Sequence, residues 1–242
     1  MKVALIADIH GNGVALELVL VALRQEAPDA IVCLGDVAAV GPQPGEVVAR
    51  LRDLRPFTIM GNTDAWLSDP ALAARMSQRL PPELVELNQW SLSRLTNEDI
   101  AYLQSFATTV SLDLGGGQTL LAYHGSPNSY DDILLATTPA AEVDQMLAGH
   151  GGTVLAGGHT HVAMLRRHGD KLLLNPGSVG SPLVVFPEIR RDPDWVEVAL
   201  LRCDRGNVSV EFRHLVLEKG VGRKTAVAAN MPHIDWWAAP WG

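Results

Sequence analysis

The sequence is poor in cysteine and has no long apolar run. Cys33 and Cys203 are the only cysteines among 242 residues. Two cysteines this far apart form neither a disulfide framework nor a zinc-binding motif, so we expect two buried free thiols. No apolar run approaches the roughly 20 residues of a membrane span. The apolar start breaks at Asp8, too early for a signal-peptide core, which predicts a cytoplasmic protein without a membrane partner.

The sequence also lacks a concentration of basic residues. Its 19 Lys and Arg residues are outnumbered by 27 Asp and Glu residues, which gives a formal net charge of −8. The arginines occur in small, scattered groups rather than in one stripe. Because nucleic-acid binding leaves a basic face as its footprint, the charge does not favour nucleic acid as a partner.

The sequence also shows no sign of a domain boundary. The chain contains no Ser/Gly linker, no low-complexity tract and no repeat of fixed period, so we expect a single domain over residues 1–242. Its C-terminal tail, about 220–242, carries Trp236, Trp237 and Trp241. We expect this tail to pack on the domain, with a homodimer contact or a membrane surface as the alternatives.

Six short apolar runs each end at glycine or at a polar residue that can bind a metal. Runs of this length bounded by glycine are typical of buried strands. Helical patterns over 14–26 and 45–54 separate the first three runs, which predicts an α/β sheet with parallel pairing. Such sheets place function at the carboxyl ends of their strands. The runs are 3–7, 30–34, 57–60, 119–123, 153–156 and 172–174.

The remaining segments carry no chemistry of their own. Residues 65–108 are expected to be helical and to cover the site or its edge. Later, 196–202 and 208–217 are expected to form a hairpin that turns at 204–207. The helices expected within 65–108 are 70–79, 82–95 and 97–106, the last capped by Thr96.

Seven polar residues follow the predicted strands and form a candidate metal site. Asp8 and His10 are two residues apart, so in extended chain both point to one side, and His159 and His161 share this spacing. Seven ligands are too many for one metal that keeps an open position, but they suit two metals about 3.5–4 Å apart with a bridging carboxylate. The seven are Asp8, His10, Asp36, Asn62, His124, His159 and His161.

The ligand types narrow the choice of metal. Mixed nitrogen and oxygen ligands without thiolate suit manganese, iron, zinc or nickel better than calcium. We expect two divalent ions, with manganese first and iron, zinc, nickel or magnesium as alternatives. The two carboxylates neutralise part of the charge of the two ions, so the site keeps about two positive charges for an anionic substrate and a hydroxide. We interpret His150, His168, His214 and His233 as ordinary residues because they lack this strand-end context.

The order of these residues resembles the calcineurin-like metallophosphoesterase superfamily, in particular its small bacterial phosphodiesterase or diadenosine-tetraphosphatase-like branch. The resemblance implies two mixed β-sheets packed together and flanked by helices, an α/β (α+β) four-layer sandwich. The matching blocks are Asp-Ile-His-Gly-Asn at 8–12, Gly-Asp at 35–36, Gly-Asn-Thr-Asp at 61–64, His-Gly at 124–125, Gly-His-Thr-His at 158–161 and Asn-Pro-Gly-Ser at 175–178.

The resemblance also assigns roles. Asp36 would bridge the metals, and a metal-bound hydroxide would attack phosphorus in line. Asn12 would contact the phosphate, and Asp64 would orient a ligand. Catalysis is expected from Asp36, Asn62, Asp64 and His124. The first metal would bind Asp8, His10, Asp36 and His161, and the second would bind Asp36, Asn62, His124 and His159.

Three positions depart from the resemblance. Many relatives have histidine in place of Thr63, where it assists as a general acid. Such a group typically raises the reaction rate 10²–10⁴-fold. Relatives often have arginine in place of Asn128 and Leu183, and arginine is the preferred bidentate phosphate ligand. Arg190 or Arg191 are candidates to replace it. The usual substrate of the family is therefore in question.

We expect a two-metal hydrolase of phosphate esters that acts on a small phosphorylated molecule or a nucleotide, with monoester and diester both open. The alternatives are a catalytically weak metal-binding or scaffold protein, a nuclease and a protein phosphatase. The intact seven-ligand set argues against a scaffold, because a scaffold has no need of every ligand.

Overall fold

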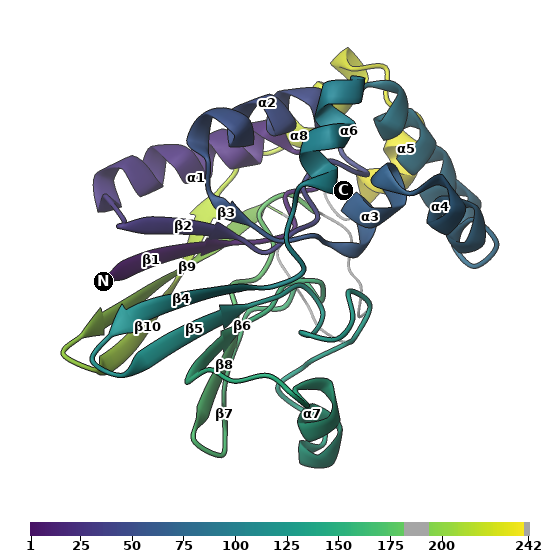
Figure 1. The fold of residues 1–242 in the computed structure, drawn as a ribbon. Coiled ribbons are helices and arrows are strands. Elements are labelled where there is room, and N and C mark those ends of the chain that lie inside the picture. The colour runs from purple at the N-terminus through teal and green to yellow at the C-terminus, as the bar shows by residue number, and fades with distance from the viewer. Residues whose placement is uncertain (182–193, 240–242) are drawn as a thin grey trace.

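The computed structural model describes residues 1–181 and 194–239. Within them the chain forms two five-stranded mixed sheets that pack face to face (Figure 1). Helices cover the outer face of the first sheet and one end of the sandwich, and a short helix lies beside the second sheet. The predicted sandwich of mixed sheets with flanking helices is confirmed.

The first sheet has the strand order β10-β9-β1-β2-β3. Its β1, β2 and β3 are parallel, as the strand–helix–strand pattern predicts, and β9 and β10 add the expected antiparallel hairpin. The elements are β1 (Lys2–Ile6), α1 (Gly13–Glu26), β2 (Ala30–Cys33), α2 (Pro44–Leu54), β3 (Phe57–Thr58), β9 (Trp195–Asp204) and β10 (Asn207–Val216).

The second sheet has the order β4-β5-β6-β8-β7, in which β5, β6 and β8 are parallel. The edge strand β4 pairs antiparallel with β5, and the edge strand β7 pairs antiparallel with β8. These two strands and helix α7 were not among the predicted elements. The elements are β4 (Val110–Gly115), β5 (Gln118–Ala122), α7 (Ala140–Met146), β6 (Val154–Ala156), β7 (Met164–His168) and β8 (Lys171–Asn175).

The stretch of chain between β3 and β4 forms a group of four helices, which covers one end of the sandwich (Figure 1). The prediction of three helices in 65–108 missed the first one, which begins at Asn62. Thr96 caps the last helix as predicted, because its Oγ1 accepts from the backbone N–H of Asp99 at 3.2 Å. The helices are α3 (Asn62–Ser68), α4 (Pro70–Met76), α5 (Pro82–Ser93) and α6 (Asn97–Gln104).

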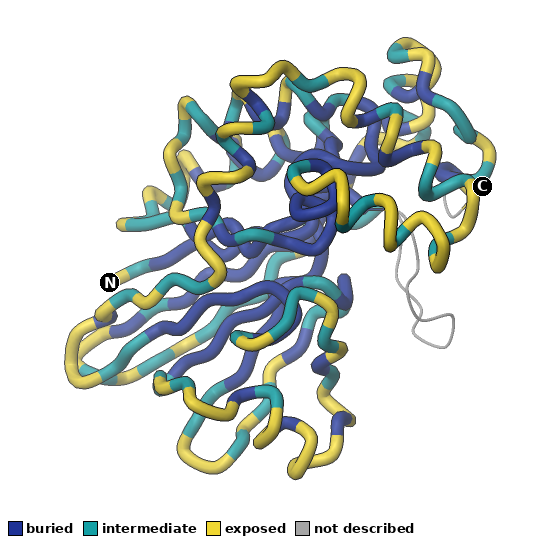
Figure 2. The backbone as a smooth tube through the Cα atoms, turned by 45° about the vertical axis from the view of Figure 1, so that its right-hand side comes forward, coloured by how far each residue is buried: buried dark blue, intermediate teal, exposed yellow. Residues whose placement is uncertain are grey.

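The core explains why β1 is almost entirely apolar. Ala4 and Ile6 face the helices α1 and α2, while Val3 and Leu5 face the second sheet. A strand buried on both faces needs apolar residues at every position rather than an alternating pattern. In Figure 2 the strand that follows the N-terminus is buried over most of its length. Both cysteines are buried free thiols, as predicted.

The C-terminal part forms α8 (Val221–Ala228) and α9 (Ile234–Trp237). Trp237 is fully buried in the core cluster that α1 and α2 share, so the tail packs on its own chain up to that residue. Trp241 lies outside the described residues, and the homodimer stays a prediction. No helix in the described parts of the chain is long and apolar enough to span a bilayer.

Candidate metal centre

The loops after the parallel strands bring the seven predicted ligands together. In the first sheet Ile6 pairs with Cys33, which places the loops after β1 and β2 side by side. His10 donates its backbone N–H to the carbonyl of Asp36 at 2.9 Å and so ties the two loops together. In the second sheet, Gly158 donates in the same way to the carbonyl of His124, also at 2.9 Å.

The ligand loops use left-handed backbone conformations. Five of the seven predicted ligands have positive φ angles between 46° and 68°, a region that residues other than glycine rarely adopt. The prediction assumed an extended backbone at Asp8 and His10 and at His159 and His161, and that assumption was wrong. The side chains of each pair nevertheless converge. Conformations of this kind cluster at functional sites, where the surrounding structure maintains them. The five are Asp8, His10, Asp36, His159 and His161.

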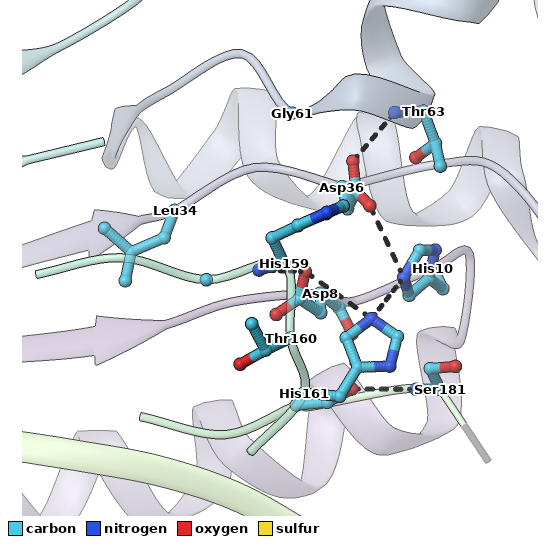
Figure 3. Close-up of polar contacts among 12 residues, drawn as sticks. Asp8, His10, Leu34, Asp36, Gly61, Thr63, His159, Thr160, His161 and Ser181 are labelled. Atoms are coloured by element: carbon cyan, nitrogen blue, oxygen red, sulfur yellow. Dashed lines mark hydrogen bonds and ion pairs between the residues drawn. The ribbon is translucent and has the colours of Figure 1, made fainter. Parts of the chain in front are cut away.

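Asp8, His10 and His161 form the first ligand group (Figure 3). Their ligand atoms all lie within 4.8 Å of one another. The Nε2 atoms of His10 and His161 are 3.0 Å apart, and Nε2 of His161 is 3.7 Å from Oδ1 of Asp8. Nδ1 of His10 lies 3.3 Å from the carbonyl oxygen of Ala39, which leaves Nε2 facing the group.

His124, His159 and Asn62 meet in a second group. The Oδ1 atom of Asn62 lies 3.0 Å from Nε2 of His124 and 3.1 Å from Nδ1 of His159. Nδ1 of His124 lies 2.7 Å from the carbonyl oxygen of Leu34, which fixes the ring orientation. A ligand histidine typically has its second ring nitrogen held in this way.

Asp36 lies between the two groups. Its Oδ2 is 3.6 Å from Nε2 of His10 (Figure 3), and its Oδ1 is 3.5 Å from Nε2 of His124. Burial disfavours its charge, but the histidines, His124 foremost, hold the pKa of Asp36 well below its usual range. One ionised carboxylate therefore presents one oxygen to each group.

The charges in the second group suit a cation. Burial and the neighbouring His124 lower the pKa of His159 to about 4, so this imidazole is neutral, the form that binds metals. Burial also opposes a charge on His124, but Asp36 and Asp8 outweigh it and raise its pKa to about 9. A divalent cation would replace that proton. The oxygen and imidazole donors of both groups fit a pair of divalent metal ions.

Asp64 holds the backbone of the ligand loops. Its carboxylate accepts from the backbone N–H groups of Asp36 and Val37, both at 2.8 Å, and of Gly61 at 3.1 Å. Burial and the charge of Asp36 raise its pKa to about 6, against the effect of these donors. At neutral pH the ionised form predominates, and it fixes the position of Asp36. These contacts support its predicted role as an orienting residue.

Asp64→Asn is expected to weaken both the fold and the metal centre. An amide offers one acceptor oxygen, and its NH₂ group would face backbone N–H donors, so we expect a loss of about 2 kcal/mol or more in unfolding free energy. Urea unfolding and metal content would measure the change. Asp69→Asn is the matched control, because Asn caps a helix about as well as Asp. A variant that unfolds like wild type would contradict this role.

Asn12 and Asn128 both have structural contacts here. Asn12 accepts from the backbone N–H of Ala15 at 3.1 Å as the cap of α1, and its Nδ2 donates to the carbonyl of Gly180 at 3.0 Å. Its predicted contact with a phosphate stays a prediction that these bonds do not favour. Nδ2 of Asn128 donates to the carbonyls of Met146 and Ala148 and so ties the loop after β5 to the end of α7.

Thr63 is buried beside the centre. Its backbone N–H donates to Oδ1 of Asp36 at 2.9 Å, while its own Oγ1 is buried without a hydrogen-bond partner in the described part of the chain. A threonine hydroxyl does not donate a proton usefully near neutral pH. Leu183, Arg190 and Arg191, the other positions in question, lie outside the described residues.

The sequence reasoning missed the backbone groups that hold the ligands. The carbonyls of Leu34 and Ala39 orient two histidine rings, and no side-chain pattern marks them. Ser178, in the Asn-Pro-Gly-Ser block, donates from Oγ to the carbonyl of Asp8 at 3.0 Å, and nearby Asn175 donates to that of Gly158 at 2.6 Å. The block therefore supports the loops after β1 and β6.

A comparison with known proteins identifies the family of this chain. A family profile for the calcineurin-like phosphoesterase superfamily domain matches residues 1–205. The uncharacterized protein MJ0912 of Methanocaldococcus jannaschii is 26% identical over 195 residues, which are 74% of this chain and 76% of that protein.

Two crystal structures share the fold. The hypothetical protein PH1004 from Pyrococcus horikoshii OT3 has a TM-score of 0.80 at 20% identity, and the match covers 96% of this chain and 94% of that one. A metallophosphoesterase from Sphaerobacter thermophilus has a TM-score of 0.75 at 24% identity, with 99% of this chain and 100% of that chain covered.

Proposed function

The chain belongs to the calcineurin-like phosphoesterase superfamily, and from this premise we propose that it hydrolyses phosphate esters with two divalent metal ions. One observation carries the proposal. The Asp36 carboxylate lies between two buried ligand groups and presents one oxygen to each. This arrangement supports a bridged pair of metals rather than a single site.

When bound, such metals lower the pKa of water and stabilise charge on a transferring phosphoryl group. Asp8, His10 and His161 would hold one ion, and Asn62, His124 and His159 the other. Asp64 would keep Asp36 in place between them. We propose manganese as the first metal to test, since the donors are nitrogen and oxygen without thiolate.

We infer the substrate class from the weak proton-donating ability of Thr63. Because its hydroxyl is a poor proton donor, the leaving group would depart without strong acid assistance. We therefore propose small phosphate esters with acidic leaving groups, either monoesters or diesters. The complete ligand set disfavours the alternative of a catalytically inert binding protein.

Hydrolysis of p-nitrophenyl phosphate and bis(p-nitrophenyl) phosphate would test the proposal. The protein would be stripped of metal and reloaded with manganese, with Asn62→Ala and His124→Ala as ligand variants. We expect turnover that needs manganese and falls at least about 10²-fold in both variants, since a lost ligand weakens transition-state stabilisation. Two bound metals without turnover of either ester would overturn the proposed activity.

A further inference from the structure

A buried carboxylate interrupts the apolar strand β9. Residues 196–201 of this strand are all buried, and Glu197 is the one charged residue among them, 6% exposed. A strand buried on both faces favours apolar residues at every position. Burial of a carboxylate is unfavourable unless hydrogen-bond donors face it. Departures of this kind from the local pattern are expected at functional sites.

Glu197 faces the second sheet at the end of the sandwich where the ligand loops lie. Side chains alternate along a strand, so Glu197 shares its face with Ala199 and Leu201, which belong to the core cluster between the two sheets. Strand β9 lies next to β1 (Figure 1) and pairs antiparallel with it, with Ala199 opposite Leu5. Glu197 therefore lies beside the segment that leads from β1 to Asp8.

The carboxylate of Glu197 holds the Asn-Pro-Gly-Ser turn that follows β8. Its Oε2 accepts from the backbone N–H of Ser178 at 3.3 Å, and its own backbone N–H donates to the carbonyl of Ser178 at 3.0 Å. Gly177, at a φ of 86°, permits this approach, because a Cβ atom built there would collide with Oε2. Oε1 lies 3.3 Å from Nε2 of His214, whose ring stacks on Trp195. The carboxylate therefore links the hairpin of β9 and β10 to this turn.

The same turn fixes the backbone of the ligand Asp8. The Oγ of Ser178 and the backbone N–H of Gly180 both donate to the carbonyl of Asp8, each at 3.0 Å. Val179 donates its backbone N–H to the carbonyl of Ala7 at 2.9 Å. Asp8 has a φ of 55°, a conformation that persists only when the surrounding structure maintains it. The turn supplies part of that support.

We propose that Glu197 is a positioning residue for the first ligand group, an inference that rests on the proposed two-metal function. It acts through Ser178, which contacts both the Glu197 carboxylate and the Asp8 carbonyl. In the second group, Asn62 and His124 follow β3 and β5 instead. The ion in the first group therefore depends on Glu197 more than the ion in the second.

Manganese binding by Glu197→Leu tests this role. Calorimetric titration of the metal-stripped chain would give two dissociation constants. We expect one of them to rise at least about tenfold and the other to stay within about threefold, since loss of a residue that supports a metal ligand typically costs 10–100-fold in affinity. Two constants that stay at their wild-type values, or that rise alike, would overturn the inference.

Three further variants locate the effect. Ser178→Ala removes the hydroxyl that reaches Asp8 and should raise the same constant. Glu197→Gln keeps an acceptor oxygen for Ser178 and should stay within about threefold of wild type. Leu201→Ala, on the same face of β9, is the control for lost stability. It should lower the urea midpoint and leave both constants unchanged.

Two results from these variants would also overturn the inference. The first is a loss in Glu197→Gln as large as that in Glu197→Leu, because the contact with Ser178 would then not be what matters. The second is a rise of the same single constant in Leu201→Ala, because lost stability alone would then explain the effect.

Turnover of bis(p-nitrophenyl) phosphate by the wild-type protein separates the two claims. Manganese-dependent turnover, with unchanged constants in Glu197→Leu, would leave the proposed function standing and refute the role of Glu197. A rise of one constant in Glu197→Leu, in a protein that binds two ions without turnover, would support the role of Glu197 and refute the hydrolytic function.

Discussion

Asp36→Asn is expected to lower kcat/KM for bis(p-nitrophenyl) phosphate by about 10³-fold. The carboxylate presents Oδ2 to His10 and Oδ1 to His124, whereas a carboxamide offers one acceptor oxygen and no charge. Its NH₂ group would face one of the two ligand groups, so that group would lose its metal. Lewis-acid stabilisation is worth several kcal/mol, and each 1.36 kcal/mol is a factor of about ten in rate.

Steady-state kinetics with manganese and a metal count on the same preparation would check this result. Asp170→Asn, at a carboxylate whose side chain is 91% exposed, is the matched control and should retain the wild-type rate and metal content. An Asp36→Asn protein with two metals and wild-type kcat/KM would show that Asp36 does not join the two groups.

Gly41→Ala should have the second large effect. A Cβ atom built on Gly41 lies 1.8 Å from the carbonyl oxygen of His10, a contact that only a backbone shift relieves. The displaced segment also carries Asp8, so the first ligand group would be distorted together with the fold. We expect a loss of about 3 kcal/mol in unfolding free energy, the upper range for overpacking, and a reduced metal content.

Urea unfolding followed by metal analysis would measure both consequences. Gly151→Ala is the control, because a Cβ atom there has no heavy atom within 4 Å and the backbone φ is not positive. A Gly41→Ala protein that unfolds at the wild-type midpoint and binds two metals would contradict the claim that close packing of the loops after β1 and β2 positions His10.

The sequence predicts the central strands and the ligand set because both depend on local signals. Strands such as β1, β2 and β6 are short apolar runs, and the glycine or polar residue that ends each run marks its carboxyl end. Parallel pairing then brings those ends together without further information. The candidate ligands stand out because mixed imidazole and carboxylate residues follow these strands in a fixed order.

The edge strands and helix α7 escaped prediction for a physical reason. Strand β7 has the sequence Met-Leu-Arg-Arg-His, in which only the first two residues are apolar, and Arg166 and His168 are half-buried between exposed neighbours. An edge strand is defined by its pairing with β8, a contact that is nonlocal in sequence. Helix α7 spans only Ala140–Met146, with Val143 as its single buried residue, and shows no apolar period.

The local geometry of the site was also beyond the sequence. Left-handed φ angles at Asp8 and His10 result from hydrogen bonds to the neighbouring loop, such as that from His10 to Asp36. Helix α3 begins at Asn62 because Asp64 closes its first turn on the N–H of Gly61, a bond that requires the loop to be in place. Such contacts depend on tertiary structure rather than on propensity.

The number and coupling of bound metals test the central claim most directly. Metal-stripped protein would be saturated with manganese, counted by mass spectrometry and examined by electron paramagnetic resonance. Because Asp36 lies between the two ligand groups, we predict two ions per chain with an exchange-coupled signal, reduced to one or none in Asn62→Ala. One ion per chain at saturation, or two ions with isolated signals, would contradict a bridged two-metal centre.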